Sequence, residues 1–311
     1  MPSDVQVVAV GAACVDEYYA AGRWIPLGDK LEVRALTPVV GGMVANVACI
    51  LSQLGVRAGL VDTVNRSETT GRILQDLTSY GVDTAHMRRD ERLPDGKCMI
   101  FLTGGERTVF AVRAEKPPLD WQQDLSYFLE ADYLYSTVSD LAQVARLPDF
   151  LDRLREGGTQ LVLDVEQYAP GAVQDLLFSR AGVLFFNEYG AAQYEDACGW
   201  KEAFRSLLEQ AARVVVVTRG AKGCSVYTRD LTRHLPACSV PVTDTTGAGD
   251  TFNAAFLSRL CRGEDCVTAA RFATAAAALC VMRYGAKGPG LCEAEVLRLL
   301  ETEERREKGD A

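Results

Sequence analysis

The sequence predicts an α/β fold, a three-layer α/β/α sandwich with a mostly parallel central sheet and a small β lid. Three observations support this prediction. Strand-like and helix-like segments alternate along most of the chain, several strand-like segments are short continuous apolar runs, and two hairpin patterns interrupt the alternation. Continuous apolar runs are typical of strands buried on both faces, as in a parallel sheet that helices cover on each side.

Apolar runs place the strands of the central sheet along the chain. The runs are VQVVAV (5–10), AGLVDTV (58–64), 132–136, LVLDV (161–165), VLFF (183–186) and VVVVT (214–218). Helices are predicted at 44–54, which ends at Gly55, at 68–80, which ends at Gly81, and near 249–262 and 265–282. Glycine commonly ends a helix because it adopts a left-handed backbone conformation without a steric penalty.

Two hairpins are predicted from paired strand-like segments. Residues 98–103 and 107–112 alternate in polarity and are joined by Gly104-Gly105. Residues 224–228 and 233–236 have the same character. Short glycine-containing connections between alternating segments are typical of hairpins.

A small lid is predicted from the first hairpin and segment 14–40, which does not follow the β/α alternation. Together they would cover one end of the sheet. We therefore expect a single domain over residues 1–311, with a lid subdomain of about 14–40 and 96–114. In open α/β sheets ligands bind at the carboxyl ends of the strands, so the lid is expected to lie over a ligand site.

The charge balance argues against nucleic acids and anionic membranes as partners. The chain carries 33 Lys+Arg and 42 Asp+Glu, a net charge of -9, and both of those surfaces are anionic. No signal-peptide pattern is present and no stretch approaches the roughly 18 apolar residues that cross a bilayer, so we expect a cytoplasmic protein. None of the ten cysteines forms Cys-x-x-Cys, and with two histidines the spacing predicts neither a zinc site nor histidine-based catalysis.

The segment most informative about chemistry is DTTGAGDTFN (244–253), which leads from a loop into an amphipathic helix. Its glycines allow a tight backbone turn without an obstructing Cβ. The N–H groups of Gly247, Ala248 and Gly249 would then point at one spot at the helix N-terminus, where phosphate oxygens bind. Asp250 follows in the first turn, where a carboxylate suits a base that takes a proton from a hydroxyl.

The 244–253 segment has a plainer interpretation as well. Asp250 alone could be a carboxylate that only stabilises the first turn of its helix. Two other phosphate-binding loops do not fit, because the dinucleotide fingerprint needs a third glycine where this chain has Phe252, and the Gly-Lys-Ser/Thr of a Walker A loop occurs nowhere.

A second glycine motif, Gly41-Gly42-Met-Val-Ala-Asn46, precedes the helix predicted at 44–54. Two glycines permit a close approach of the backbone to a small polar ligand. Asn46, one turn into the helix, offers both a donor and an acceptor. On its own the motif is equally compatible with a simple turn and a surface asparagine.

With these motifs the chain resembles the PfkB carbohydrate kinase family, which has the ribokinase-like fold. Asp16, the glycine pair, TRGAKG (218–223), DTTGAGD (244–250) and GAKG (285–288) follow in the family's order over nearly the whole chain. The resemblance implies ATP-dependent phosphorylation of a hydroxyl, expected to be primary, on a sugar or sugar acid. It also implies ATP and Mg²⁺ as cofactors, an effect of K⁺, and in some members a homodimer through the lid.

The resemblance carries roles over to individual residues. Asp250 is the implied base, and Gly247, Ala248 and Gly249 form the implied anion hole. The residues implied to bind the substrate are Asp16, Gly41, Gly42 and Asn46. Those implied to lie at ATP are Asn187, Thr218, Gly220, Gly223, Gly285 and Ala286, and a monovalent cation is implied near Asp244 and Thr246.

The chain departs from the family pattern in three places. An Asn-x-x-Glu element tied to Mg²⁺ begins correctly at Asn187 but ends in Gly190, so Glu188, acting through water, is the candidate replacement. The family's Asp-x-Asn becomes Asp164-Val-Glu166. The residue after the glycine pair is Met43, which cannot bind a hydroxyl strongly, so the substrate is expected to differ from ribose.

The lid bears on the substrate. Arg107 and Arg113 flank its second strand at an even spacing, which places them on one face, where an arginine would suit a carboxylate or phosphate of the substrate. Two solvated arginines are the plainer interpretation. Tyr18, Tyr19 and Trp24 would suit a base pocket, so a nucleoside kinase of the same fold is one alternative. A non-catalytic sugar or nucleotide sensor is the other, favoured by Gly190 and disfavoured by an intact Gly-Ala-Gly-Asp.

Overall fold

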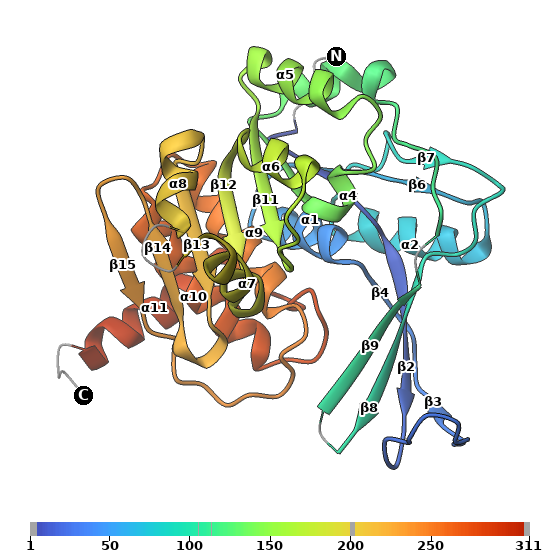
Figure 1. Cartoon of the computed structure of the whole chain (residues 1–311). Coiled ribbons are helices and arrows are strands. Elements are labelled where there is room, and N and C mark those ends of the chain that lie inside the picture. Colours follow the sequence, from blue (N-terminus) through green and yellow to red (C-terminus); the bar gives the residue numbers. More distant parts are fainter. Residues whose placement is uncertain (1–4, 105, 113, 200–202, 308–311) are drawn as a thin grey trace.

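The apolar runs form an eight-stranded central sheet (Figure 1). The computed structural model describes residues 5–104, 106–112, 114–199 and 203–307. Across the sheet the order is β15 (Thr232–Leu235), β14 (Cys224–Tyr227), β13 (Val214–Thr218), β12 (Ala181–Phe186), β11 (Gln160–Val165), β10 (Tyr133–Thr137), β1 (Val7–Val10) and β5 (Ala58–Val61). The strands from β13 to β5 pair in parallel, and β14 and β15 form an antiparallel hairpin at one edge.

Successive residues of a central strand are buried under opposite helical layers. In β13, Val214 and Val216 belong to one hydrophobic cluster and Val215 and Val217 to the other, and none is more than 1% exposed. Burying one such side chain contributes about 1.5–3 kcal/mol of transfer free energy. The two-sided burial explains why these strands are uninterrupted apolar runs rather than alternating ones.

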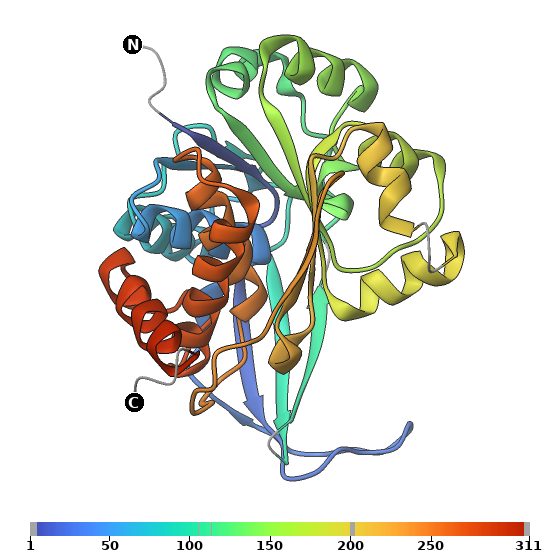
Figure 2. The ribbon, with the colours of Figure 1, turned by 90° about the vertical axis from the view of Figure 1, so that its left-hand side faces the viewer.

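Helices cover both faces of the sheet, which confirms the predicted sandwich (Figure 2). One layer contains α1 (Met43–Gln53), α2 (Glu68–Ser79), α9 (Ala248–Leu260), α10 (Cys266–Val281) and α11 (Glu293–Glu307). The other contains α3 (Leu125–Glu130), α4 (Val138–Leu141), α5 (Leu147–Gly157), α6 (Ala172–Phe178), α7 (Glu188–Cys198) and α8 (Ala203–Gln210). Two short 3-10 turns, η1 (Trp121–Asp124) and η2 (Gly220–Lys222), lie in the connections.

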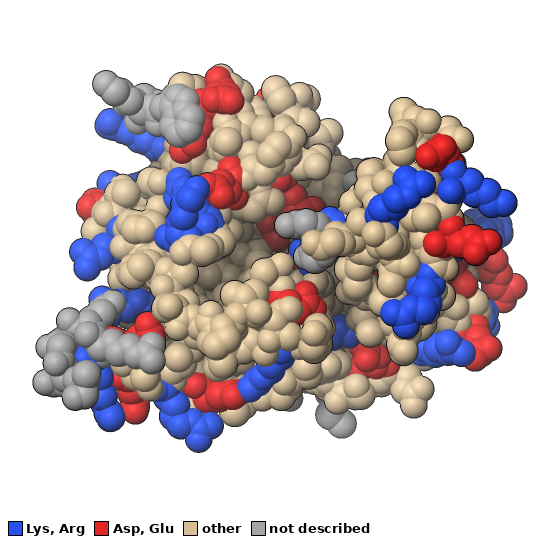
Figure 3. Space-filling model, turned by 90° about the horizontal axis from the view of Figure 1, so that it is seen from below, with Lys and Arg blue, Asp and Glu red and all other residues tan. Residues whose placement is uncertain are grey.

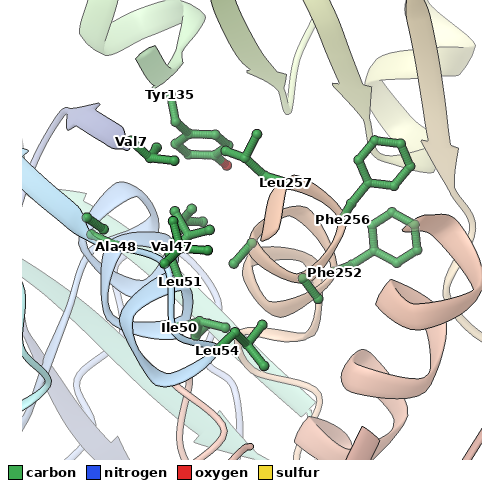
Figure 4. Packing of buried hydrophobic residues seen from close by; sticks show 14 of the residues in the cluster. Val7, Val47, Ala48, Ile50, Leu51, Leu54, Tyr135, Phe252, Phe256 and Leu257 are labelled. Atoms are coloured by element: carbon green, nitrogen blue, oxygen red, sulfur yellow. The ribbon is translucent and has the colours of Figure 1, made fainter. Parts of the chain in front are cut away.

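Helices α1 and α9 pack side by side beneath β10 (Figure 4). Leu51 of α1 and Leu257 of α9 lie in the same cluster as Tyr135 of β10. Alanines that are fully buried, such as Ala48 and Ala254, leave room for the two helices to approach closely. This packing brings the first turns of two helices together although about two hundred residues separate them along the chain.

A second, five-stranded sheet projects from one end of the molecule (Figure 1). Its strands are β3 (Arg34–Ala35), β2 (Cys14–Ala20), β8 (Lys97–Thr103) and β9 (Glu106–Val112), with β4 (Val39–Gly41) also paired to β2. The predicted hairpin at 98–112 is confirmed as β8 and β9. Two further short strands, β6 (Thr63–Val64) and β7 (Arg88–Arg89), pair in parallel nearby.

The register of the second sheet decides which side chains share a face. Asp16 of β2 lies opposite Cys98 of β8, and Leu102 of β8 lies opposite Arg107 of β9. Because side chains alternate along a strand, Asp16, Cys98 and Arg107 occupy one face. Tyr19 and Phe101 occupy the other.

Asp16, in the segment 14–40 of the predicted lid, belongs to β2 of the second sheet, and β1 ends earlier at Val10. One detail of the sequence prediction is wrong. The strand expected at 58–64 is two strands, since β5 ends at Val61 and the carboxylate of Asp62 accepts hydrogen bonds from the N–H groups of Ala13 and Thr63. Within the described ranges, no helix has both the length and the apolar composition to span a bilayer.

Candidate active site

The glycine-rich loop and the start of α9 form a rigid turn against residues 285–287. Gly247 is the N-cap of α9 with φ 75, in the left-handed region, and a Cβ there would lie 1.9 Å from the carbonyl oxygen of Ala286. Asp244 joins the two loops, because its carboxylate accepts hydrogen bonds from the N–H groups of Thr246 (2.9 Å) and Gly285 (3.2 Å). The first N–H groups of a helix lack intrahelical partners, so this turn presents donors to an anion.

Asp250 lies in the first turn of α9, as expected. Its Oδ2 accepts a hydrogen bond of 2.8 Å from Nδ2 of Asn46, on the first turns of α1. Desolvation, with the charges of Glu166 and Asp16, raises the pKa of Asp250 to about 7, although Asn46 and Arg107 act to lower it. A carboxyl group with a pKa near 7 is suited to accept a proton at neutral pH.

The glycine pair explains how Asp16 reaches this site. A Cβ on Gly41 would lie 2.1 Å from Oδ2 of Asp16, so only glycine lets the carboxylate pack there. Gly42 has φ 102, and a Cβ on it would lie 2.4 Å from the carbonyl oxygen of Ala12. Asn46 is buried, and its Oδ1 has no hydrogen-bond partner among the described residues, so the side chain retains an unused acceptor.

A buried polar network, missed by the sequence analysis, supports α9 from below. Asn253 donates from Nδ2 to Asp164 Oδ2 (2.8 Å) and to the hydroxyl of Tyr135 (3.2 Å). The Tyr135 hydroxyl in turn donates to Asp164 Oδ2 at 3.1 Å. Desolvation, then the charges of Glu166 and Asp250, raise the pKa of Asp164 to about 8. The sequence pattern did not reveal this role, because Asp164 lies inside an apolar run that indicates only a buried strand.

Arg107 lies on β9 beside the β8–β9 turn and reaches the glycine-rich loop. Its guanidinium donates a hydrogen bond to Oγ1 of Thr246 in the glycine-rich loop. The sequence left two interpretations open, a contact with the substrate and a solvated arginine, and the structure brings the side chain to the glycine-rich loop. Arg113, the second predicted arginine, lies outside the described residues.

A cavity of about 620 Å³ borders the start of α9. Three predicted nucleotide-site residues, Thr218, Gly220 and Gly223, line it together with Ala248 and Gly249. One wall is the alanine-rich helix α10, with Thr274, Ala277 and Ala278. Gly285 and Ala286 instead line a different cavity beside α2, with Lys287 and Tyr80.

A further cavity of about 510 Å³ lies between the ends of β1 and β5 and the second sheet. It is lined by Cys14, Cys98, Asp62, Asp140 and Lys116. Lys116 Nζ lies 2.5 Å from Asp62 Oδ1, so a cation and its partner form part of the wall. Figure 3 shows this face hollowed between the body of the molecule and the second sheet, with acidic side chains deep in the hollow. Polar residues that follow apolar strands were the available sequence signal for Asp62 and Asp140.

The Asn-x-x-Glu departure has a structural reason. Asn187 caps α7 and accepts the N–H of Gly190 at 2.7 Å. A Cβ on Gly190 would lie 2.5 Å from the carbonyl oxygen of Val165, so this backbone leaves no room for a glutamate. Glu188, the candidate replacement, is exposed and holds Lys222 at 2.7 Å. Glu166, just past the carboxyl end of β11, is instead close enough for its charge to raise the pKa of Asp250.

Comparison with known proteins identifies the family. Residues 5–291 match the pfkB family of carbohydrate kinases. The chain belongs to this family. The predicted resemblance is therefore confirmed, and with it the prediction that the chain is a sugar kinase.

Relatives in the family cover almost the whole chain. A ribokinase of Staphylococcus aureus is 24% identical over 91% of this chain and 95% of its own length. A 5-dehydro-2-deoxygluconokinase of Bacillus velezensis is 24% identical over 96% of both chains. A nucleoside kinase of Methanothermobacter thermautotrophicus is 26% identical over 92% of both.

Solved structures confirm the ribokinase-like fold. The ribokinase of Thermotoga maritima has a TM-score of 0.82 at 23% identity and covers 96% of this chain and 99% of that chain. A putative ribokinase II of E. coli, solved with ATP and Mg²⁺, has a TM-score of 0.80 at 20% identity over 96% of this chain and 99% of that chain.

Proposed function

We propose that this kinase transfers the γ-phosphoryl group of ATP to a hydroxyl, expected to be primary, of a sugar or sugar acid, with Asp250 as the base. The observation that carries this proposal is the position of Asp250. It follows the anion-binding turn, its pKa is raised to about 7, and Asn46 holds its carboxylate. A carboxylate that only stabilised the start of α9 would have no need of a raised pKa or of the hydrogen bond from Asn46 on α1.

We propose that ATP and the sugar bind in different cavities, ATP in the 620 Å³ cavity and the sugar beside the 510 Å³ cavity. ATP lies in the 620 Å³ cavity, with its γ-phosphate at the N–H groups of Gly247, Ala248 and Gly249. The sugar lies toward Asp16 and Asn46, and its hydroxyl gives its proton to Asp250 as the oxygen attacks phosphorus. Phosphoryl transfer depends mainly on positioning and charge stabilisation, which the rigid turn and Arg107 supply.

Mg²⁺ fits the carboxylates of the cleft. This ion prefers oxygen ligands, often one or two carboxylates together with phosphate oxygens and water. Glu166 is exposed at the carboxyl end of β11 and close enough to raise the pKa of Asp250, whereas Glu188 is engaged with Lys222. We therefore assign the supporting carboxylate to Glu166 instead of Glu188. When bound, the ion would neutralise charge on the phosphates of ATP.

The predicted monovalent cation remains a proposal, placed at the loop of Asp244 and Thr246. Both carboxylate oxygens of Asp244 accept backbone N–H groups, so the side chain fixes the loop whose carbonyl groups would bind K⁺. Activity with K⁺ is expected to exceed activity with Na⁺, and equal rates would contradict the site.

Sugars and sugar acids are favoured by the lining of the second cavity. Asp62 and Asp140 in this lining can accept hydrogen bonds from sugar hydroxyls, and Lys116 can bind a carboxylate. Arg107 lines the cavity proposed for ATP instead. The nucleoside alternative keeps one of its three aromatic residues, because Tyr18 shares the inner face with Asp16. Tyr19 and Trp24 instead stack with Phe101 and Phe110 on the opposite face of the second sheet. An intact base disfavours a non-catalytic sensor.

The second sheet is proposed to act as the lid over this cavity, formed by residues 14–40 and 96–114. Its outer face is aromatic and partly exposed, since Trp24 is 53% and Phe110 47% exposed. A homodimer through this face would bury these side chains. A Trp24→Asp variant is expected to lower the molar mass measured by light scattering, and an unchanged monomeric mass in the wild type would contradict the dimer.

A coupled ADP-release assay tests the function. ATP, Mg²⁺ and K⁺ are supplied with ribose, fructose, 2-keto-3-deoxygluconate, inositols or nucleosides. A substrate-dependent signal that disappears in Asp250→Asn supports the proposal. Turnover of nucleosides alone would favour the nucleoside kinase, and ATP binding without turnover of any sugar would favour the sensor.

A further inference from the structure

Two cysteines and an aspartate converge on the inner face of the second sheet. Cys14 and Asp16 are two residues apart on β2, so both point to the same face, and the parallel register sets Cys98 of β8 opposite Asp16. The sulfur atoms of Cys14 and Cys98 lie 3.8 Å apart, and Sγ of Cys14 lies 3.6 Å from Oδ1 of Asp16. In the described part of the chain, this is the one group of three or more His, Cys, Asp or Glu whose ligand atoms all lie within 4.8 Å of one another.

These separations match a tetrahedral metal centre. Two thiolates bound at about 2.3 Å to a tetrahedral Zn²⁺ are about 3.8 Å apart. A thiolate and a carboxylate oxygen bound at about 2.3 Å and about 2.0 Å are about 3.5 Å apart. Two of the three separations therefore have the tetrahedral values, and the third, from Cys98 Sγ to the Asp16 carboxylate, is within 4.8 Å. Binding requires loss of the thiol protons and at most a small side-chain adjustment.

The surroundings provide an entry path and an open fourth position. Cys14 and Cys98 both line the 510 Å³ cavity between the second sheet and the ends of β1 and β5. Cys14 and Asp16 are buried, each 7% exposed, which excludes competing solvent from two of the ligands. Because both cysteines line this cavity, water or another small ligand can reach a metal ion that the three side chains hold.

A disulfide fits the same atoms less well. A disulfide bond needs the two sulfur atoms about 2.05 Å apart, so the pair would have to close by well over 1 Å across a strand pairing that already holds them. A disulfide also leaves the convergence of Asp16 unexplained, whereas a metal ion uses all three groups.

We propose that Cys14, Asp16 and Cys98 form a binding site for a soft divalent cation such as Zn²⁺, and that the bound ion inhibits the kinase by withdrawing Asp16 from the sugar. The metal site itself goes beyond the proposed function. The proposed inhibition rests on the proposed function, because inhibition requires that Asp16 binds the sugar. Mg²⁺ would not compete effectively, since it avoids thiolate ligands.

Co²⁺ is a suitable probe because its thiolate complexes absorb in the near ultraviolet. The test uses the reduced full-length chain with Cys198 and Cys292 replaced by serine, since these exposed thiols would bind metal nonspecifically. This chain is expected to bind one Co²⁺ with a thiolate absorption band that Zn²⁺ displaces. Cys98→Ser in the same background should lose the band and weaken binding by more than the roughly 10- to 100-fold that loss of an outer-shell partner costs.

Separate outcomes address the site and its consequence. No thiolate band in the reduced chain, or a band that persists in Cys98→Ser, overturns the metal site. Formation of a Cys14–Cys98 disulfide in air, with no metal binding to the reduced chain, also overturns it and points to a redox pair. Cys98 is only half-buried and at the edge of the cavity, so the serine variant is expected to fold, which its unchanged melting temperature checks.

Inhibition kinetics then test the link to catalysis. Zn²⁺ is expected to raise KM for the sugar and leave KM for ATP unchanged, and Cys98→Ser is expected to raise the inhibitory Zn²⁺ concentration at least about tenfold. Metal binding without any change in sugar KM would overturn the proposed inhibition and the placement of the sugar at Asp16. It would leave the phosphoryl-transfer role of Asp250 untouched.

Discussion

The central sheet and the second sheet differ in what covers their faces. Strands such as β13 are buried on both sides by helices, and their valines are almost fully shielded from solvent. The second sheet has one face toward the cleft, with Asp16, Cys98 and Arg107, and an outer face with Trp24 and Phe110 exposed. The rigid sheet positions the glycine-rich turn, while the open sheet supplies the side chains that we propose contact the sugar.

The contrast between the sheets predicts two kinds of variant. Changes at the carboxyl end of the central sheet should affect the chemical step, because that region positions the base and the anion-binding turn. Changes on the inner face of the second sheet should affect sugar binding instead. The experiments that follow would break the distinction if both regions changed the same kinetic constant.

Asp250→Asn is expected to have the largest effect. Asparagine retains an oxygen for Asn46 Nδ2 but cannot accept the proton, so kcat should fall by about 10²- to 10⁴-fold while the protein stays folded and ATP binding is preserved. Steady-state kinetics and calorimetric ATP titration measure these quantities. Asp265→Asn, at the N-cap of the neighbouring helix α10, is the matched control because asparagine also caps helices well. Wild-type kcat in Asp250→Asn would refute the base.

The pH dependence of the reaction should reflect the raised pKa of Asp250. The base must be ionised, so kcat/KM should fall as the pH drops below about 7, by about tenfold per pH unit. The stability of the fold changes with pH in the opposite direction. The carboxyl group of Asp250 holds its proton more tightly in the folded state than in the unfolded state, because its folded pKa is raised. Ionisation above the unfolded pKa therefore costs stability as pH rises, and Asp250→Asn should gain melting temperature over the wild type more at pH 8 than at pH 5. A rate that is flat between pH 5 and 8 would contradict the assignment.

Gly41→Ala tests the second sheet. The new Cβ would collide with Oδ2 of Asp16 and displace the carboxylate, so KM for the sugar should rise by about 10-fold or more, as expected when about 1.4 kcal/mol of binding is lost. KM for ATP should stay the same. Gly22→Ala is the control, because a Cβ there meets nothing within 4 Å. Equal changes in the KM for the sugar and the KM for ATP would contradict the idea that the second sheet binds only the sugar.

Glu166→Gln should have a smaller effect that is specific to Mg²⁺. If Glu166 supports the ion through water, the Mg²⁺ concentration for half-maximal ADP binding should rise by roughly tenfold, while ADP binding without Mg²⁺ is unchanged. Glu188→Gln is the matched control, since its carboxylate holds Lys222 on the surface. The reverse result, with Glu188→Gln alone changing the Mg²⁺ requirement, would restore the assignment made from the sequence.

Local patterns in the sequence were sufficient for much of the fold and for the position of Asp250, the proposed base. The valine runs, the helix stops at glycine and the 244–253 motif involve residues that are neighbours along the chain, so their chemistry is readable directly. Gly247 is an example, because the left-handed turn that it makes requires glycine at that one position.

The sequence by itself thus determined the parallel sandwich, the glycine-rich turn and the place of Asp250 at the start of a helix. Tertiary structure alone decided that Gly41 packs on the carboxylate of Asp16 and that Tyr19 and Trp24 face outward. It also decided that the charge of Glu166 acts on Asp250, that Glu188 pairs with Lys222 and that Cys14 meets Cys98. These contacts depend on strand register and on which face a side chain takes, and a shift of one residue in register reverses every face.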